Sequence, residues 1–356
     1  MEKKLSLKAF LNIGLALCIL AAACTPAAST AASQATLNVM THDSFAASEP
    51  VIASFEQQNN VKLNFIKSGD AGALVNKAIL AKNAPLADVL YGVDNTFLSR
   101  ALGAGIFEPY ASPLLKDIPS EFKLDPTNQA LPVDYGDVCI NYDKTYFKDK
   151  NLQPPSTLDD LLKPEYKGLL VTENPATSSP GLAFLMATVV DFGQEGFLNY
   201  WKNLKANGLV VVNDWETAYY TNFSGSSGKG AQPMVVSYNS SPAAEVVFAK
   251  TPPADSPTAS VTGAGTCFRQ VEFVGVLKGT RNITLAQKFI DFMLGVTFQE
   301  DMPLQMFVYP ANPNAKLPDA FVKYAQLPVQ PAEMSPDEIA ANRDNWIQAW
   351  QNAVLK

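Results

Sequence analysis

The sequence contains only one histidine, His42, and this scarcity limits the chemistry that the protein can perform. A histidine-rich zinc site would need several imidazole ligands, and a serine hydrolase would need His42 itself as the general base. The chain also lacks a glycine-rich phosphate loop, a Cys-x-x-Cys pair and a Gly-x-Ser-x-Gly turn. These absences argue against zinc hydrolysis and leave little support for other common enzyme classes.

Positive charge is also scarce, because 27 Lys and Arg residues stand against 34 Asp and Glu residues, and the formal net charge is -7. A surface of this sign repels phosphate backbones, so we expect no nucleic-acid partner. Neutral or cationic solutes are the expected ligands. Only one long apolar run occurs, at residues 10–20, although 47% of the residues are hydrophobic. We therefore expect a soluble, globular chain after that run.

The N-terminal segment has the features of a bacterial export signal. Three lysines precede the apolar run, which is shorter than the roughly 20 residues that span a bilayer and ends at three alanines and Cys24. We expect a lipoprotein signal peptide over residues 1–23 and a lipid on Cys24. An uncleaved anchor, or a signal cleaved elsewhere, is the alternative. Residues 25–36 have no charged or large apolar side chain, which predicts a flexible tether over residues 24–36.

Two of the four cysteines remain in the expected folded part, because Cys18 belongs to the signal and Cys24 to the lipid attachment. In an oxidising compartment, the simplest interpretation of Cys139 and Cys267 is one disulfide bond. Such a bond requires their Cα atoms to lie within about 7 Å. A catalytic thiol at Cys139 is the competing interpretation, and it requires a free thiol.

Strand-like and helix-like segments alternate along the chain, which is typical of an α/β fold. About 320 residues follow the tether, so we expect two lobes, each with its own sheet. The first lobe is predicted from strands at 36–40, 61–66 and 87–91 and helices at 50–58, 73–82 and 95–102. The second is predicted from strands at 168–172, 209–213 and 233–238 and helices at 180–191 and 194–204. Two later helices are predicted at 284–294 and 335–356.

Two extended segments, 132–143 and 267–277, lie where the pattern of one lobe gives way to that of the other. We interpret them as paired crossover strands that form a hinge. A bond between Cys139 and Cys267 would join them.

Polar and aromatic side chains follow the expected strands, at the edge where ligands bind in open α/β sheets. They lie in THDSF (41–45), GVDN (92–95), DYG (134–136), TSSPG (177–181), NDW (213–215) and SYNSSP (237–242). We expect these six segments to converge on one cleft between the lobes. Its candidate residues are His42, Asp43, Asp94, Asp134, Tyr135, Ser178, Ser179, Trp215, Tyr238, Asn239, Ser240, Ser241 and Phe307.

These residue types suit a flat organic cation. Aromatic faces attract cations by roughly 0.5 to 2 kcal/mol each, and the carboxylates of Asp43, Asp94 or Asp134 add Coulomb attraction. The serine-rich turn before residue 180 is a candidate anion pocket for a phosphate. Helix capping is the alternative role for Asp43, Asp94 and the two serines of that turn.

The order of the segments resembles that of the thiamine-binding periplasmic proteins of ABC importers. The similarity runs nearly end to end through THDSFA, ADVLYGVDN, PVDYG, NPATSSPGL, NDWETAY, VVSYNSSPA, QVEF, VYPAN and RDNWIQAWQ. The resemblance implies an α/β, two-lobed periplasmic-binding fold of type II with two crossover hinge strands. It also implies that the cleft closes over thiamine or a thiamine phosphate, which is then delivered to a membrane permease.

The resemblance also implies roles for single residues. Ser178, Ser179, Trp215 and the turn 238–241 would hold the phosphate or hydroxyethyl end of the ligand, and Asp70 would be a further contact.

The chain departs from the family pattern at three positions. The family commonly has Tyr where His42 stands, Trp where Phe307 stands, and a second Tyr near Ala244. The cysteines in DYGDVC and CFRQVEF resemble a variant found in part of the family, which is consistent with a disulfide.

The implied organisation is a monomer in the cell envelope, either periplasmic or on the outer face of the cytoplasmic membrane. We expect lobe I at 37–134 and 271–310, lobe II at 139–266, and C-terminal helices at 311–356 that pack on the lobes. The expected partners are thiamine or its phosphate, ABC permease subunits, and the membrane through the lipid on Cys24. No cofactor and no metal are expected.

Three other functions fit part of the sequence. A ferric-ion carrier of the same fold would use tyrosines and a histidine, such as Tyr219, Tyr220 and His42, although in such carriers the tyrosine pair follows the later strand. A thiaminase-like enzyme would use Cys139 as the nucleophile and Glu272 as the activating carboxylate. A surface adhesin or structural lipoprotein would leave the cleft without a role. We favour a transport binding protein over an enzyme.

Overall fold

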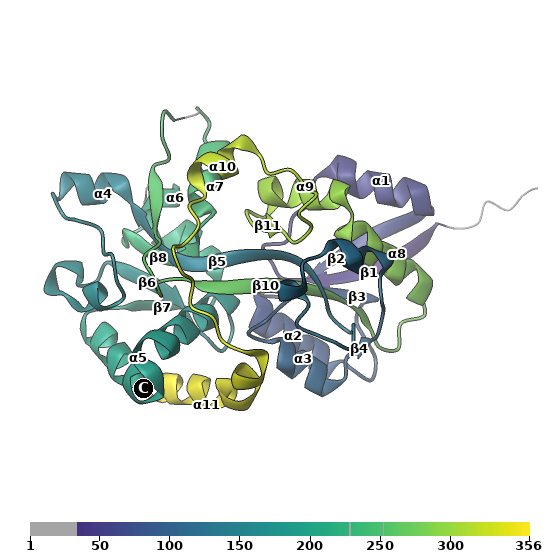
Figure 1. Ribbon diagram of the computed structural model, residues 1–356, viewed down its shortest axis with the longest axis horizontal. Helices are drawn as coiled ribbons and strands as arrows, with labels where there is room; N and C mark the ends of the chain where they lie inside the picture. Colours follow the sequence, from purple (N-terminus) through teal and green to yellow (C-terminus); the bar gives the residue numbers. More distant parts are fainter. Residues whose placement is uncertain (1–33, 228, 252) are drawn as a thin grey trace, which may run out of the picture. The chain divides into compact units, whose positions relative to one another are not determined.

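The computed structural model describes residues 34–227, 229–251 and 253–356 (Figure 1). The predicted signal peptide at 1–23 and the predicted lipid attachment at Cys24 lie outside the described residues. The first strand, β1 (Ala35–Thr41), includes the last two residues of the predicted tether. None of the helices in the described part of the chain is long and apolar enough to span a membrane.

The first part of the described chain forms three βα units, which confirms the predicted order of strands and helices. It contains β1, α1 (Glu49–Asn59), β2 (Val61–Lys67), α2 (Ala71–Leu80), β3 (Val89–Asp94) and α3 (Leu98–Ala104). β1 pairs in parallel with both β2 and β3. β3 is buried along its whole length, as expected for a central parallel strand.

A second group of parallel strands follows later in the chain. It contains β6 (Leu170–Glu173), α5 (Ser179–Ala206), β7 (Val210–Val212), a π-helical turn (Thr217–Asn222), β8 (Met234–Tyr238) and α7 (Ser241–Val247). β6 pairs in parallel with β7 and β8. α5 is broken at Gly193, whose φ of 70° and ψ of 170° are not helical. The two helices predicted on either side of this residue are therefore confirmed.

Two long strands, β5 (Leu131–Asp143) and β10 (Phe268–Leu277), run side by side between the two groups (Figure 1). They pair in antiparallel fashion, which confirms the predicted crossover pair. β10 also pairs with β3, and β5 also pairs with β8. The described strands therefore form one continuous sheet in the order β2-β1-β3-β10-β5-β8-β6-β7. The expectation of a separate sheet in each lobe was wrong, because the long crossovers pair with strands on both sides.

The disulfide expected between the crossovers is present. Cys139 in β5 is bonded to Cys267, directly before β10, and their Cα atoms are 4.3 Å apart. Both side chains are fully buried. Val138 and Phe268 face each other in the ladder, so the strand register itself brings the neighbouring cysteines together.

The C-terminal helix α11 (Pro336–Val354) packs against α5 and α3, and so connects the two groups of elements. The hydroxyl of Ser335 caps it by accepting a first-turn amide at 3.2 Å. Trp346 and Trp350 lie on its buried face, as their four-residue spacing predicts. Trp350 packs edge-to-face on Trp201 of α5.

The remaining elements are short or peripheral. They are β4 (Phe107–Glu108), α4 (Lys144–Asp149), α6 (Ser224–Ser227), β9 (Thr258–Val261), α8 (Ile283–Leu294), α9 (Val296–Gln305), β11 (Tyr309–Pro310) and α10 (Asp319–Tyr324). Single 3-10 turns occur at Pro113–Asp117, Ser120–Phe122, Asp159–Leu162 and Pro164–Tyr166. β4 pairs with β10, whereas β9 and β11 pair with β5.

Candidate ligand-binding cleft

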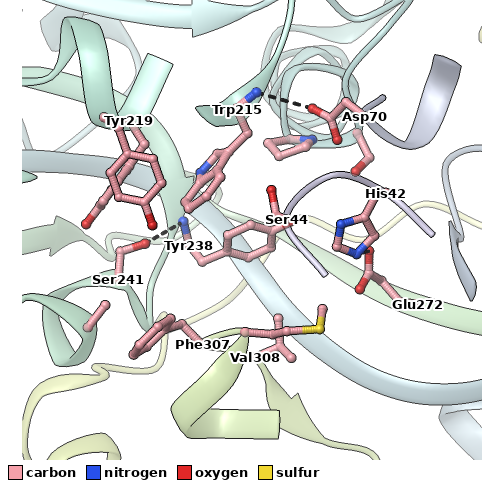
Figure 2. Close-up of a pocket in the computed structure, with 15 residues that line it drawn as sticks. His42, Ser44, Asp70, Trp215, Tyr219, Tyr238, Ser241, Glu272, Phe307 and Val308 are labelled. Carbon is pink, nitrogen blue, oxygen red and sulfur yellow. Dashed lines mark hydrogen bonds and ion pairs between the residues drawn. The ribbon is translucent and has the colours of Figure 1, made fainter. Parts of the chain in front are cut away.

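A cleft lies where the turns after β1, β6, β7 and β8 meet the N-terminus of α2, the strand β10 and the segment before β11 (Figure 2). Its free space is about 610 Å³, part of which is open to solvent. The lining residues are His42, Ser44, Asp70, Ser179, Pro180, Trp215, Tyr219, Tyr220, Tyr238, Ser241, Ala244, Glu272, Met306, Phe307 and Val308.

The cleft brings together half of the residues expected at it. They are His42, Asp70, Ser179, Trp215, Tyr238, Ser241 and Phe307. The residues that do not line it are Asp43, Asp94, Asp134, Tyr135, Ser178, Asn239 and Ser240. Four of the six predicted segments therefore contribute lining residues, whereas GVDN and DYG do not.

Trp215 and Tyr219 form an aromatic wall. Their rings stack with centroids 5.0 Å apart and an interplanar angle of 18°. Tyr220 meets Trp215 edge-on at 5.4 Å. The indole N–H of Trp215 donates to Oγ of Ser237 at 2.9 Å, and the hydroxyl of Tyr219 donates to Glu245 at 2.6 Å. These contacts hold both stacked rings in one orientation.

Tyr238 lies in the middle of the cleft (Figure 2). Its hydroxyl donates to Oε1 of Gln270 at 2.6 Å. Its ring lies against Gly136 of β5, where a Cβ atom would come within 2.7 Å of Cδ1, so a glycine is required for this approach. Ser241 accepts the amide of Tyr238 at 3.3 Å and lies 2.9 Å from the hydroxyl of Ser237. Two hydroxyl groups therefore meet beside the aromatic wall.

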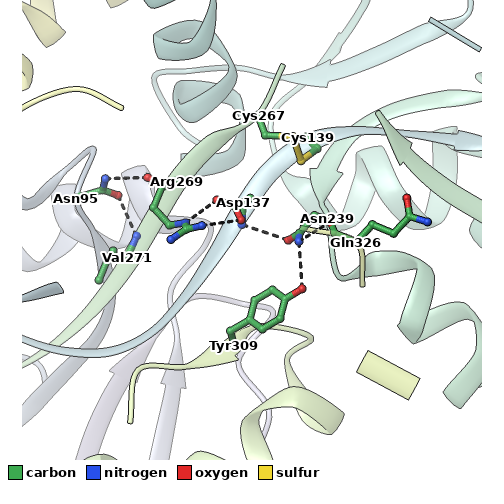
Figure 3. A network of polar contacts seen from close by, with 9 residues as sticks. All are labelled: Asn95, Asp137, Cys139, Asn239, Cys267, Arg269, Val271, Tyr309 and Gln326. Atoms are coloured by element: carbon green, nitrogen blue, oxygen red, sulfur yellow. Dashed lines mark hydrogen bonds and ion pairs between the residues drawn. A yellow bond between two sulfur atoms is a disulfide. The ribbon is translucent and has the colours of Figure 1, made fainter. Parts of the chain in front are cut away.

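Asn239 and Ser240 support the border of the cleft and do not line it. Asn239 donates to the hydroxyl of Tyr309 at 3.1 Å and to the carbonyl of Gln326 at 2.9 Å (Figure 3). Ser240 donates to the carbonyl of Phe307. These bonds tie the turn after β8 to the chain around β11. Phe307 enters the cleft from a left-handed backbone conformation, with a φ of 57°.

Asp70 lies at the N-terminus of α2, and Ser178 and Ser179 lie at the N-terminus of α5. Asp70 caps α2 by accepting the amide of Ala71 at 2.9 Å, and it also accepts the amide of Trp215 at 3.3 Å. Burial raises the pKa of Asp70 above its ordinary value. Ser178 precedes α5 but makes no capping hydrogen bond, so the capping alternative is not supported for it. Ser179, in the first turn of α5, lines the cleft.

A buried polar cluster of His42, Glu272, Tyr91 and Asp134 lies at one end of the cleft. Nε2 of His42 is 3.7 Å from Oε1 of Glu272. The hydroxyl of Tyr91 lies between the two carboxyls, 2.7 Å from Oδ2 of Asp134 and 2.9 Å from Oε2 of Glu272.

The pKa values of the two carboxyls of this cluster are shifted in opposite directions. Burial and the charge of Glu272 raise the pKa of Asp134 well above its ordinary value. Burial also raises the pKa of Glu272, but the charge of His42 and the hydrogen bond from Tyr91 outweigh burial, and the net pKa is lowered. Asp134 therefore binds its proton more tightly than an ordinary aspartate, and Glu272 is the carboxyl of the two that ionises more readily.

Asp94 and Asp43 also make structural contacts. Asp94 accepts the amides of Thr96 and Phe97 at 2.9 and 3.1 Å in the turn before α3, but the N-cap residue of α3 is Phe97, so the helix-capping alternative for Asp94 is not confirmed. Asp43 accepts the amide of Gly69 at 2.8 Å and caps no helix, because α1 begins later in the chain. It lines a small acidic hollow beside the cleft.

Tyr135 packs away from the cleft. Its ring stacks on Phe122 at 4.7 Å and on Tyr309 at 5.2 Å, and the guanidinium of Arg269 lies 5.0 Å from its centroid. Arg269 is itself held by Asp137 at 2.5 and 3.0 Å (Figure 3). Successive strand residues point to opposite faces, which is why Tyr135 lies apart from its neighbour in the polar cluster.

Eight further residues line the cleft and were not named as candidates for it from the sequence, although Ser44 and Pro180 lie in segments that were expected there. The eight residues are Ser44, Pro180, Tyr219, Tyr220, Ala244, Glu272, Met306 and Val308. Tyr219 follows Trp215 by four residues, and that helical spacing is a signal of ring contact. Glu272 is the one charged residue in the buried stretch 270–277 of β10, and this pattern indicates a functional candidate.

Comparison with known proteins shows where the chain belongs. Residues 84–334 match the family described as bacterial extracellular solute-binding protein. The thiamine-binding periplasmic protein of Escherichia coli (strain K12) is 31% identical over 325 residues, 90% of this chain and 94% of that protein. The thiamine-binding periplasmic protein of Brucella suis biovar 1 is 32% identical over 90% of this chain and 92% of its own.

A solved structure of a periplasmic thiamin binding protein has a TM-score of 0.78 and 29% identity to this chain, and the match covers 90% of this chain and 96% of that one. The predicted two-lobed periplasmic-binding fold is thereby confirmed. The chain belongs to the bacterial extracellular solute-binding proteins, and thiamine-binding periplasmic proteins are its relatives within that family.

Proposed function

We propose that this protein binds thiamine or a thiamine phosphate in the cleft and delivers it to the permease of an ABC transporter. The observation that carries the proposal is the stacked pair Trp215 and Tyr219, which lines the same cleft as the carboxyls of Asp70 and Glu272. Ring faces attract a flat cation through their quadrupole, and an ionised carboxylate adds Coulomb attraction. The thiazolium of thiamine is such a cation. The sequence relatives support the same ligand.

The polar groups of the cleft suggest how the ligand lies. Ser179 and Ser241 supply hydroxyls, and Ser179 belongs to the first turn of α5, where backbone amides favour an anion. We place the hydroxyethyl or phosphate end of the ligand there. Figure 2 shows Ser241 and His42 on opposite sides of the cleft, so the pyrimidine would lie toward His42.

Transport would use closure of the lobes about β5 and β10. The predicted lobe limits, 37–134 with 271–310 and 139–266, place Asp70 and Trp215 on different lobes. Their hydrogen bond of 3.3 Å would then join the lobes at the cleft. A ligand with contacts on both sides stabilises the closed state over the open state, and the permease can distinguish the two.

We further propose that the protein is an exported, monomeric lipoprotein anchored at Cys24 after removal of residues 1–23. The basis is the sequence pattern together with the periplasmic location named for the relatives. Labelling of cells with a radioactive fatty acid should mark the wild-type protein and not the Cys24→Ala variant. Equal labelling of both proteins would contradict the proposed lipid attachment at Cys24.

The thiaminase-like enzyme and the ferric-ion carrier have less support as functions of this protein. A nucleophilic Cys139 needs a free thiolate, whereas its sulfur is bonded to Cys267 and fully buried. For a ferric site, no group of three or more His, Cys, Asp or Glu side chains within the described residues is arranged to hold a metal ion. The hydroxyl of Tyr219, which a ferric site would need as a ligand, donates a hydrogen bond to Glu245.

Native mass spectrometry of the purified protein tests the proposal. The protein is mixed with thiamine, thiamine monophosphate, thiamine diphosphate and the isolated pyrimidine, and the bound mass identifies the ligand. We expect one intact thiamine or thiamine phosphate per chain. A bound fragment, or no bound mass with any of the four, would contradict the proposal.

A further inference from the structure

His42 occupies a tightly packed position in the cleft wall. It follows β1 and is only 7% exposed. Its ring packs against Gly92 of β3, where φ is +101° and a Cβ atom would come within 2.4 Å of Cδ2 of the imidazole. The centroid of the Tyr91 ring lies 5.6 Å away. The backbone of β3 thus fixes the position of the imidazole, and only a residue without a side chain fits at Gly92.

Nε2 of His42 is buried but has no hydrogen-bond partner among the described residues. The nearest charged group is Glu272 of β10, at 3.7 Å. The carboxyls of Asp70, at the start of α2, and Asp43, in the turn of His42 itself, also act on the imidazole. The cleft wall therefore contains one buried donor without an acceptor and an acidic group next to it.

The charges around His42 favour its protonated form. Burial lowers the pKa of His42, but the carboxylates of Glu272, Asp70 and Asp43 outweigh burial, and the net pKa lies above its ordinary value. Behind Glu272, the pKa of Asp134 is raised well above its ordinary value, and Tyr91 donates a hydrogen bond to Glu272.

We propose that His42 and Glu272 act together as a donor and acceptor pair that selects a ligand with an aminopyrimidine edge. This inference rests on the proposed function, because thiamine carries such an edge. Nε2–H of His42 donates to a ring nitrogen, and Oε1 of Glu272 accepts from the adjacent amino group. Oε2 of Glu272 already accepts from Tyr91, which orients the carboxylate.

The pair would reject an analogue in which the amino group is replaced by oxygen. Oxythiamine has this change, presents a carbonyl oxygen to Glu272 and carries an N–H in the adjacent ring position. The carbonyl oxygen would then face the carboxylate of Glu272, acceptor against acceptor, and the ring N–H would face Nε2–H of His42, donor against donor. All four groups would be left without hydrogen-bond partners in a buried site. Sites built on hydrogen bonds discriminate strongly against ligands that leave such groups unpaired.

The single histidine of the chain allows a direct test on the wild-type protein by NMR. The pKa of His42 is measured in the free protein and in its complexes with thiamine and oxythiamine. Both ligands carry the same thiazolium, so its charge cancels in the comparison. A ring nitrogen that accepts from Nε2 stabilises the imidazolium, whereas an N–H opposes it. We expect a higher His42 pKa with thiamine than with oxythiamine, and equal values would overturn the inference.

Affinity measurements on variants test the Glu272 half of the pair. The wild type should prefer thiamine over oxythiamine, and Glu272→Gln should reduce that preference by about tenfold or more, because the amide can donate to the carbonyl oxygen. Loss of the imidazolium proton lets Nε2 of His42 accept a hydrogen bond, so the preference for thiamine should weaken as the pH rises above the pKa of His42. His42→Gln should remove this pH dependence. Met306→Leu, at the same cleft but outside the pair, is the matched control and should change both affinities by the same factor.

The possible outcomes separate this inference from the proposed function. If the wild type binds thiamine but shows no preference over oxythiamine, or if Glu272→Gln keeps the preference, the pair does not select the ligand and the proposed function stands. If the wild type binds neither compound, both are wrong.

Discussion

The carboxyl of Asp70 accepts a hydrogen bond from the backbone amide of Trp215, with 3.3 Å between N and Oδ2 (Figure 2). Asp70 begins α2 in the first group of βα units, and Trp215 lies in the turn after β7 in the second group. The amide of Gly72 makes a similar contact with the carbonyl of Thr177 at 3.1 Å. These contacts bring the two groups of elements together beside the lining residues of the cleft.

Replacement of Asp70 by alanine should therefore affect both stability and binding. The variant loses the cap of α2, which costs about 1 kcal/mol of unfolding free energy. It also loses the bond to Trp215, so we expect affinity for thiamine to fall by about tenfold, or about 1.4 kcal/mol. Thermal unfolding and calorimetric titration measure the two effects.

Ser335→Ala is the matched control for this prediction. Ser335 caps α11 at an exposed position outside the cleft. The control should lose similar stability and keep the wild-type affinity. If both variants bind thiamine equally well, the contact between Asp70 and Trp215 has no part in ligand binding.

Trp215→Ala should weaken thiamine binding by at least about tenfold, because it removes the ring that stacks on Tyr219 and lines the cleft. Trp215→Phe keeps an aromatic face but loses the bond from the indole N–H to Ser237, and should lie between alanine and wild type. Fluorescence or calorimetric titration can rank the three proteins. Wild-type affinity in the alanine variant would show that the aromatic wall does not contribute to thiamine binding.

The periodicity of the sequence predicted the βα order, the crossover pair and the break at Gly193, because local apolar spacing reports burial directly. It could not predict side-chain direction at strand ends. Asp134 and Tyr135 are adjacent polar candidates, yet one joins the buried polar cluster and the other stacks on Tyr309. Which carboxyl has a raised pKa also cannot be predicted from the sequence, because the shift depends on contacts such as that between His42 and Glu272.

Asp134→Asn should stabilise the protein, and the gain should grow with pH. The pKa of Asp134 is raised on folding, so the unfolded chain releases its proton at lower pH than the folded one. Wild-type stability is therefore lost as the pH rises above the ordinary aspartate value of about 4 toward the folded value. Asparagine mimics the protonated acid and avoids this loss. Thermal unfolding at pH 5 and pH 8 tests the sign.

An exposed carboxylate supplies the comparison for that experiment. Asp149→Asn, on the surface at the end of α4, should change the unfolding temperature by the same amount at both pH values. A gain for Asp134→Asn that is the same at pH 5 and pH 8 would show that folding does not raise the pKa of Asp134.

Removal of the disulfide should lower stability without abolishing binding. The bond closes a loop with a sequence separation of 128 residues, for which the chain-entropy model gives about 5 kcal/mol. The double variant Cys139→Ala, Cys267→Ala should unfold at lower denaturant concentration and still bind thiamine. A folded double variant that no longer binds would show that the disulfide is needed for ligand binding.

The most direct test of the central claim is a calorimetric titration of the purified protein with thiamine and its mono- and diphosphate, followed by mass spectrometry of the recovered ligand. We expect saturable binding of one ligand per chain, with the ligand recovered intact. No saturable heat with any of the three compounds would contradict the proposed ligand, and recovery of cleaved thiamine would show an enzyme instead of a carrier.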